Sequence, residues 1–315
     1  MVIGYIDLTK FDKITWMVFM YDRIGSDSEP GYYFDMDQNG DTLDSFSLTS
    51  FTRCDSFQNA PSGSADHPLA DYYNMNHYRR GHAIIFSHIQ FDGDLAKREG
   101  ASKDAKDLEE VLVALKFNVK VYTDLKYGAI YEVITTLSQS DHSDVDCLLV
   151  AVLSHGDRGK VYARDHQYPP DFLWKSFSGD KCPSLAGKPK LFFVQACRGD
   201  ETDDGSRVRM ATQVDSQASY TIPVMADILV MYSCYDGYVS WRSTRTGSWF
   251  IQSLCEELKT RSKSTDLLTI LTFLNRRMAI TYKSVAPSKK EMHGKKQIGT
   301  IVSTLTRLLY FYPVE

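Results

Sequence analysis

From about residue 83, short apolar runs and longer stretches of mixed apolar and polar residues follow one another in a regular pattern along the chain. Short, almost purely apolar runs are typical of strands that lie buried inside a parallel sheet. They are separated by longer stretches in which apolar residues recur at helical spacing. The pattern predicts strands over 83–86, 119–122, 147–153, 191–194 and 228–232, and helices over 101–115, 129–137, 248–259 and 266–280. Because strands and helices alternate, the sequence predicts an α/β fold with a mostly parallel sheet.

The first 71 residues do not share this pattern. Residues 35–41 and 60–66 have turn-forming composition, which is typical of loops. Residues 1–70 contain eleven Asp and Glu against four Lys and Arg, a net charge of −7. We expect residues 1–71 to form an acidic leader that is largely disordered. The early aromatic residues leave open the alternative of a short hydrophobic docking element there.

A second polar interruption lies between the predicted strands at 191–194 and 228–232. Residues 200–217 are rich in Asp, Thr, Ser and Gly and poor in apolar residues. An exposed, cleavable loop inside an α/β domain is uncommon unless it has a function. It divides the rest of the chain into a larger segment, 72–215, and a smaller segment, 216–315.

Composition excludes several classes of protein. With 315 residues, of which 43% are hydrophobic, the chain can bury a large core. Its net charge of −4 argues against nucleic acid as a partner. The apolar run 14–20 is too short to span a membrane, and the first residues lack the features of a secretory signal. The six cysteines are too sparse for a disulfide scaffold and show no zinc-binding spacing, so we expect a cytoplasmic protein.

Residues capable of chemistry follow two of the predicted strands. Ser154-His155-Gly156 follows the strand at 147–153, and Gln195-Ala196-Cys197-Arg198-Gly199 follows the strand at 191–194. The carboxyl ends of parallel strands meet at one edge of a sheet. A thiol and an imidazole at this edge suit nucleophilic attack on a carbonyl, with backbone N–H groups of Gly156 and Cys197 available to hold the oxyanion. This chemistry needs no metal and no organic cofactor.

The same residues carry a resemblance to a known family. Gln195-Ala196-Cys197-Arg198-Gly199 resembles the active-site pentapeptide of the caspases, and Ser154-His155-Gly156, with its histidine 42 residues upstream, has the form found in that family. Further similar strings lie at 73–77, 186–190, 240–243 and 247–255, in the family's order. The chain is most similar to an invertebrate executioner caspase. The resemblance implies the caspase-haemoglobinase fold, with a six-stranded, mostly parallel sheet and helices on both faces.

The resemblance also implies a function and a substrate site. Caspases are cysteine endopeptidases that cut proteins after aspartate, are made as zymogens and act in apoptotic execution. The positions that match the family's aspartate pocket are Arg98, Gln195 and Arg242, and a bidentate arginine suits a carboxylate. By the same resemblance, Ser240 and Arg242 pair with the substrate backbone. Trp241 and Trp249 line outer pockets, or are alternatively ordinary core residues.

Processing and partners follow from the resemblance as well. The zymogen would be cut after Asp215 into a large and a small subunit that stay together, and the leader would be released after Asp66 or Asp71. Asp215 as an ordinary loop residue is the alternative. We expect a homodimer of processed subunits, an upstream caspase as activator, and inhibitor-of-apoptosis-type proteins as possible regulators. The leader lacks the repeated amphipathic helices of a recruitment module, which favours an executioner.

Two rival functions remain at this point. A caspase-like regulator or scaffold binds partners without cutting them, but such proteins lose the cysteine, the histidine or a pocket arginine, and all are present here. A related protease that cuts after Arg or Lys would need acidic residues where this chain has Arg98 and Arg242.

Overall fold

Six strands form the central sheet, in the order β11-β8-β7-β3-β1-β2. The computed structural model describes residues 69–203, 223–287 and 289–312. All neighbouring strands are parallel except the pair of β11 and β8, which is antiparallel. The expected mostly parallel sheet is therefore confirmed. Its strands are β1 (His82–Ser87), β2 (Asn118–Thr123), β3 (Leu148–Leu153), β7 (Lys190–Gln195), β8 (Ile228–Tyr232) and β11 (Thr300–Ser303).

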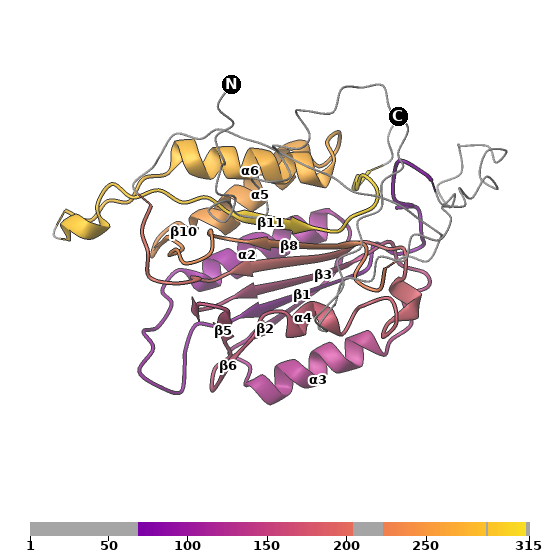
Figure 1. Ribbon diagram of the computed structural model, residues 1–315, viewed down its shortest axis with the longest axis horizontal. Helices are drawn as coiled ribbons and strands as arrows, with labels where there is room; N and C mark the ends of the chain where they lie inside the picture. The colour runs from indigo at the N-terminus through magenta and orange to yellow at the C-terminus, as the bar shows by residue number, and fades with distance from the viewer. Residues whose placement is uncertain (1–68, 204–222, 288, 313–315) are drawn as a thin grey trace, which may run out of the picture. The chain divides into compact units, whose positions relative to one another are not determined.

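Helices cover both faces of this sheet (Figure 1). One face packs against α2 (Ala101–Ala114), α5 (Trp249–Arg261) and α6 (Leu267–Thr281), and the other against α3 (Tyr127–Ser138) and α4 (Phe172–Lys175). Successive residues of a strand face opposite sides, so Leu149 joins the first core and Val150 the second. Since both faces are covered, every residue of β3 and β7 is buried, which explains their continuous apolar sequences.

Side-chain caps fix where two of the helices begin. The Ser248 hydroxyl accepts from the N–H of Ile251 at the start of α5, and Asp266 accepts from the N–H of Thr269 at the start of α6. Each cap satisfies a backbone donor that has no partner inside its helix. The two helices therefore begin at the positions that the apolar spacing predicts.

Short elements surround the sheet. They are the strands β4 (Gly156–Asp157), β5 (Lys160–Tyr162) and β6 (Gln167–Tyr168), the hairpin of β9 (Arg242–Ser243) and β10 (Gly247–Ser248), and the 3₁₀ turns η3 (Pro183–Leu185) and η4 (Lys290–Met292). β4 and β9 contain residues with predicted roles in the site. None of these elements is long enough to show a periodic pattern in the sequence.

Several predictions concern segments outside the described residues. The leader up to residue 68, Asp66 and Asp215 all lie there, and so does the linker from residue 204. The first residues of the predicted linker are described, and they are held by backbone bridges. Glu201 pairs with Tyr238, and Asp203 pairs with Lys296.

Candidate active site

Cys197 lies two residues beyond the end of β7, at the carboxyl edge of the sheet. Its side chain is partly exposed, whereas the other cysteines that the structure describes are buried. The sulfur accepts a hydrogen bond from the backbone N–H of Ser240 at 3.3 Å. The preceding residue, Ala196, is held to Ser233 by two hydrogen bonds, of 3.2 and 2.9 Å. The thiol is therefore both accessible and fixed in place, as a nucleophile requires.

His155 follows β3, the neighbouring strand, at the same edge. Its Nε2 lies 2.7 Å from the carbonyl oxygen of Ala96, and the Phe91 ring packs against the imidazole with 5.0 Å between ring centroids. Because a carbonyl can only accept, Nε2 carries the hydrogen, and the neutral ring has its lone pair on Nδ1. Burial lowers the pKa of His155, and the charges of Arg98 and Arg242 lower it further. The imidazole is therefore neutral at neutral pH and able to accept a proton.

Two glycines near the cysteine allow backbone segments to approach each other closely. A Cβ atom on Gly156 would lie 2.4 Å from the carbonyl oxygen of Cys197. Gly199 has a positive φ of 155°, and a Cβ atom there would lie 2.2 Å from the carbonyl oxygen of Gly237. No side chain fits at either position. Gly156 therefore lets its backbone lie directly against that of Cys197.

Arg98 lies directly before α2, and its side chain is completely buried. One terminal nitrogen donates to the carbonyl oxygens of His88 and Leu153, at 2.7 and 2.9 Å. Its Nε and its other terminal nitrogen have no hydrogen-bond partner among the described residues. Burial, and next the charge of Arg242, lower the pKa of Arg98 to about 9. A buried guanidinium with unused donors is costly, and a carboxylate ligand would relieve that cost.

Arg242 lies in the β9–β10 hairpin, far from Arg98 in the sequence. Burial lowers its pKa, and both Asp104 and the Cys197 sulfur affect it through their charges. Cys197 and Asp104 affect Arg98 in the same way. Each guanidinium therefore interacts electrostatically with both Cys197 and Asp104.

Gln195 and Ser240 meet at the same place. The Gln195 side chain is buried, and its Nε2 donates to the Ser240 hydroxyl at 2.8 Å. The amide nitrogen has a second hydrogen, and its oxygen has no partner among the described residues. Gln195 thus has a second donor hydrogen besides the one that bonds to Ser240.

The two predicted tryptophans form a stack. Trp241 stacks on Trp249 at 5.8 Å between ring centroids, and Trp249 stacks on Tyr282 at 5.2 Å. Trp249 is only 8% exposed, whereas Trp241 is partly exposed. Trp241 therefore offers most of the apolar surface at this point, and Trp249 supports it from behind.

Comparisons with known proteins agree with this geometry. The family model described as "Caspase domain" matches residues 80–310. Caspase-1 of Spodoptera frugiperda is 51% identical over 244 residues, covering 77% of this chain and 82% of that protein, and drICE of Drosophila melanogaster is 49% identical over 243 residues, covering 76% and 72%. The crystal structure of the Spodoptera caspase-1 matches with a TM-score of 0.74 at 49% identity, covering 80% of this chain and 99% of that one.

The chain belongs to the caspase family. It is a cysteine-type endopeptidase that cleaves proteins after aspartate and acts in apoptosis, and the fold, family and activity expected from the sequence are confirmed. The similarity to invertebrate effector caspases is confirmed as well.

Sequence reasoning missed Asp104, a positioning residue of this caspase. Asp104 is buried and accepts hydrogen bonds from the N–H of Ser248, at 2.9 and 3.0 Å, and from Gln252 at 3.2 Å. It ties the hairpin that carries Arg242 to the helix that follows Arg98. A signal was present, because Asp104 stands on the apolar face of its helix beside Ala101, Ala105 and Leu108. A charged residue at such a position is unusual unless it has partners.

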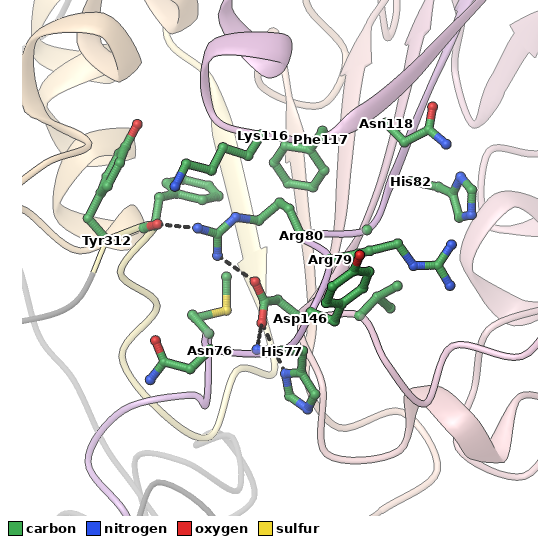
Figure 2. Close-up of a pocket in the computed structure, with 15 residues that line it drawn as sticks. Asn76, His77, Arg79, Arg80, His82, Lys116, Phe117, Asn118, Asp146 and Tyr312 are labelled. Atoms are coloured by element: carbon green, nitrogen blue, oxygen red, sulfur yellow. Dashed lines mark hydrogen bonds and ion pairs between the residues drawn. The ribbon is translucent and has the colours of Figure 1, made fainter.

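A separate cavity of about 580 Å³ lies at the opposite edge of the sheet, near the amino ends of β1 and β2 (Figure 2). The Arg80 side chain enters it and donates to Asp146 at 2.8 Å and to the carbonyl oxygens of Leu115 and Phe311. His77 donates to the same Asp146 from its backbone at 2.8 Å. These contacts join the large segment to the end of the small one, and no residue predicted for the active site lines this cavity.

Two further features of the described part of the chain bear on function. No helix there has the length and apolar character needed to cross a membrane. Within the same residues, no group of three or more His, Cys, Asp or Glu side chains is arranged to hold a metal ion.

Proposed function

We propose that Cys197, His155 and Gly156 carry out the hydrolysis by this caspase. The Cys197 thiol passes its proton to Nδ1 of His155, and the thiolate attacks the carbonyl carbon of the substrate aspartate. The N–H groups of Gly156 and Cys197 stabilise the oxyanion. His155 gives the proton to the leaving amine as the C–N bond breaks. Water then hydrolyses the thioester, which releases the acid and regenerates the thiol.

Aspartate selectivity rests on Arg98 and Arg242, with Gln195 as a third donor. The observation that carries this assignment is the buried Arg98 guanidinium, which keeps two nitrogens without partners in a site that also contains Arg242. A substrate carboxylate would supply both the missing acceptors and the missing negative charge. A neutral or basic side chain would supply neither.

The substrate backbone pairs with Ser240 and Arg242, and its next side chains contact Trp241 and Trp249. Extended peptides commonly bind by adding a strand to exposed backbone groups. The stack of Trp241, Trp249 and Tyr282 supports this assignment, since it presents a rigid aromatic surface beside the strand.

Activation proceeds by cleavage after Asp215, within the linker 200–217, and by release of the acidic leader after Asp66 or Asp71. An upstream caspase performs the first cut. The resulting large and small subunits, 72–215 and 216–315, stay together because β7 and β8 are neighbours in one sheet. The backbone at Asp71 is held in place, because its carbonyl oxygen accepts from the N–H of Leu308 at 2.9 Å.

The processed protein forms a homodimer through β11. This strand is an edge of the sheet, and Val302 on it is 51% exposed. An edge strand offers unpaired backbone groups, and two copies of one strand can pair antiparallel about a twofold axis. We place this protein in the cytoplasm, where its buried free thiols stay reduced. Inhibitor-of-apoptosis-type proteins are candidate regulators.

A peptide assay tests the catalytic assignment. We expect Cys197→Ala and His155→Ala to abolish cleavage of a fluorogenic peptide with aspartate before the cut, whereas Cys255→Ala, which changes a buried thiol on α5, remains active. Activity of Cys197→Ala equal to that of the parent would refute the assignment.

A further inference from the structure

The side chain of Gln297 lies buried between the end of β8 and the proposed substrate strand. Only 3% of this residue is exposed. Its Oε1 accepts from the backbone N–H of Trp241 at 2.7 Å, and its Nε2 donates to the carbonyl oxygen of Ser233 at 2.7 Å. Nε2 also lies 3.3 Å from the Ser240 hydroxyl. One amide thus joins Ser233, Ser240 and Trp241, and of these Ser240 contacts the Cys197 sulfur.

The contacts of Gln297 and those of Cys197 lie on opposite sides of the backbone at Ser240 and Trp241. In an extended strand, the backbone groups of successive residues point to opposite sides. Both backbone groups of Trp241 are used on one side, where Gln297 accepts from the N–H and the carbonyl oxygen accepts from the N–H of Trp249 at 3.2 Å. The N–H of Ser240 therefore points the other way, and it does reach the Cys197 sulfur. Gln297 holds the strand from behind while its front faces the nucleophile.

We propose that Gln297 is a positioning residue that holds the segment Ser240–Arg242, which leads into β9, in register with Cys197 for substrate binding. The inference rests on the proposed role of this segment in binding the substrate backbone. Without the amide, the Trp241 N–H and the Ser233 carbonyl lose buried partners, and the strand shifts to satisfy them. The substrate then loses a preorganised partner, while Ala196 keeps its two hydrogen bonds with the Ser233 hydroxyl and His155 keeps its bond to Ala96.

Asn275 provides a matched control. It also anchors the segment before β11, since its amide nitrogen donates to the carbonyl oxygen of Gly299 at 3.1 Å and its oxygen accepts from the Gly299 N–H at 3.0 Å. These contacts are with Gly299 and not with Ser240 or Trp241. Asn275→Ala therefore loosens the same segment without releasing the substrate strand.

The first experiment compares Gln297→Met with Asn275→Ala in steady-state cleavage of an aspartate peptide, with enzyme concentration set by active-site titration. We expect Gln297→Met to raise KM about tenfold while kcat falls less than about threefold. A merely structural role lowers the titrated amount of active enzyme and leaves KM unchanged. An unchanged KM in Gln297→Met, or an equal rise in Asn275→Ala, would overturn the proposal.

A second variant, Gln297→Glu, should have a KM that depends on pH. It also provides a test of the proposal if Gln297→Met does not fold. Gln297→Glu keeps an oxygen for the Trp241 N–H but, when ionised, has no donor for the Ser233 carbonyl. Protonation at lower pH restores a donor. We expect the ratio of its KM to that of the parent to decrease as the pH is lowered from about 8 to about 6. A ratio that is constant across this range would contradict the proposal.

The role of Gln297 and the proposed role of the substrate-binding segment are refuted by different results. If the parent protein cleaves the aspartate peptide and Gln297→Met has an unchanged KM, only the role of Gln297 is refuted. If Trp241→Ala in the parent leaves KM unchanged as well, the proposed role of the substrate strand is refuted with it.

Discussion

Arg98 and Arg242 lie close enough for the charge of Arg242 to lower the pKa of Arg98, yet no ion pair joins either one to a carboxylate within the described residues. Two like charges held in a partly desolvated site repel each other. Asp104 offsets part of this repulsion by its own charge. We therefore expect the site to favour a negatively charged ligand, and this preference can be measured directly.

Removal of one guanidinium should reduce the preference for aspartate over its neutral isostere. We expect the parent to cleave a peptide with aspartate before the cut far better than the same peptide with asparagine. In Arg242→Gln this ratio should fall by about 10- to 100-fold, since a charge-assisted hydrogen bond contributes about 1.5–3 kcal/mol. Comparison of kcat/KM for both peptides in both proteins gives the coupling between the arginine and the carboxylate.

Arg79→Gln is the control for this experiment. Arg79 forms an exposed pair with Asp144 at 2.7 Å and lines the cavity at the opposite edge of the sheet. Its loss should leave the aspartate preference unchanged. If Arg242→Gln keeps the full preference of the parent, the carboxylate does not bind there.

Gly156→Ala should abolish activity without unfolding the protein. The added methyl group would lie 2.4 Å from the carbonyl oxygen of Cys197, which forces the two backbone segments apart. We expect kcat to fall at least about 100-fold, comparable to the loss of an oxyanion donor. Gly128→Ala is the matched change, because a Cβ atom there meets nothing within 4 Å. Retained activity in Gly156→Ala would show that this backbone segment takes no part in catalysis.

The acid limb of the pH profile should report His155. Burial lowers the pKa of this imidazole, so the neutral form persists below the ordinary value of about 6.5. Since the proposed mechanism needs the neutral ring, kcat/KM should stay high until the pH falls below about 6.5. Phe91 contributes to the burial, and Phe91→Ala should shift the limb to higher pH. A limb that moves to lower pH, or does not move, would argue against this origin of the shift.

Apolar periodicity predicted five of the six strands of the sheet and missed the edge strand β11. β3 and β7 are buried along their whole length, so their sequences are unbroken apolar runs. β11 has four residues, none of them buried, and their burial does not alternate along the strand. Nothing in such a short segment separates it from a loop. A six-stranded sheet could therefore be expected only from the resemblance to the caspases.

The active site was also only partly predictable from the sequence. Cys197 and His155 could be found because each follows a strand and stands in a motif of distinctive residues. Gln297 could not be found, because its role depends on the direction of two backbone groups that are 56 and 64 residues away in sequence. Ala96 contacts His155 through its backbone carbonyl oxygen. Any residue at this position would supply the same oxygen, so the sequence gives no signal of this contact.

Release of the leader should depend on Asp66 and not on Asp71. Proteolysis needs an extended peptide that can leave its own structure and enter the protease. The residues around the bond after Asp71 are held on both sides. The Asp71 carbonyl accepts from the N–H of Leu308 at 2.9 Å, and the N–H of Tyr73 donates to the Leu308 carbonyl at 3.1 Å. The buried Tyr73 side chain also donates from its hydroxyl to Asp227 at 2.7 Å.

We therefore expect Asp66→Ala to block removal of the leader by an activating caspase, whereas Asp71→Ala should be processed at the rate of the parent. N-terminal sequencing of the large subunit decides between the sites. A large subunit that begins at His67 agrees with the paired backbone at Asp71, and a large subunit that begins at Tyr72 would contradict it. Tyr73→Phe removes the hydroxyl that donates to Asp227 and accepts from the N–H of Thr306 at 2.9 Å. If these two contacts help to protect Asp71, this variant should show increased cleavage before Tyr72, because the segment opens more often.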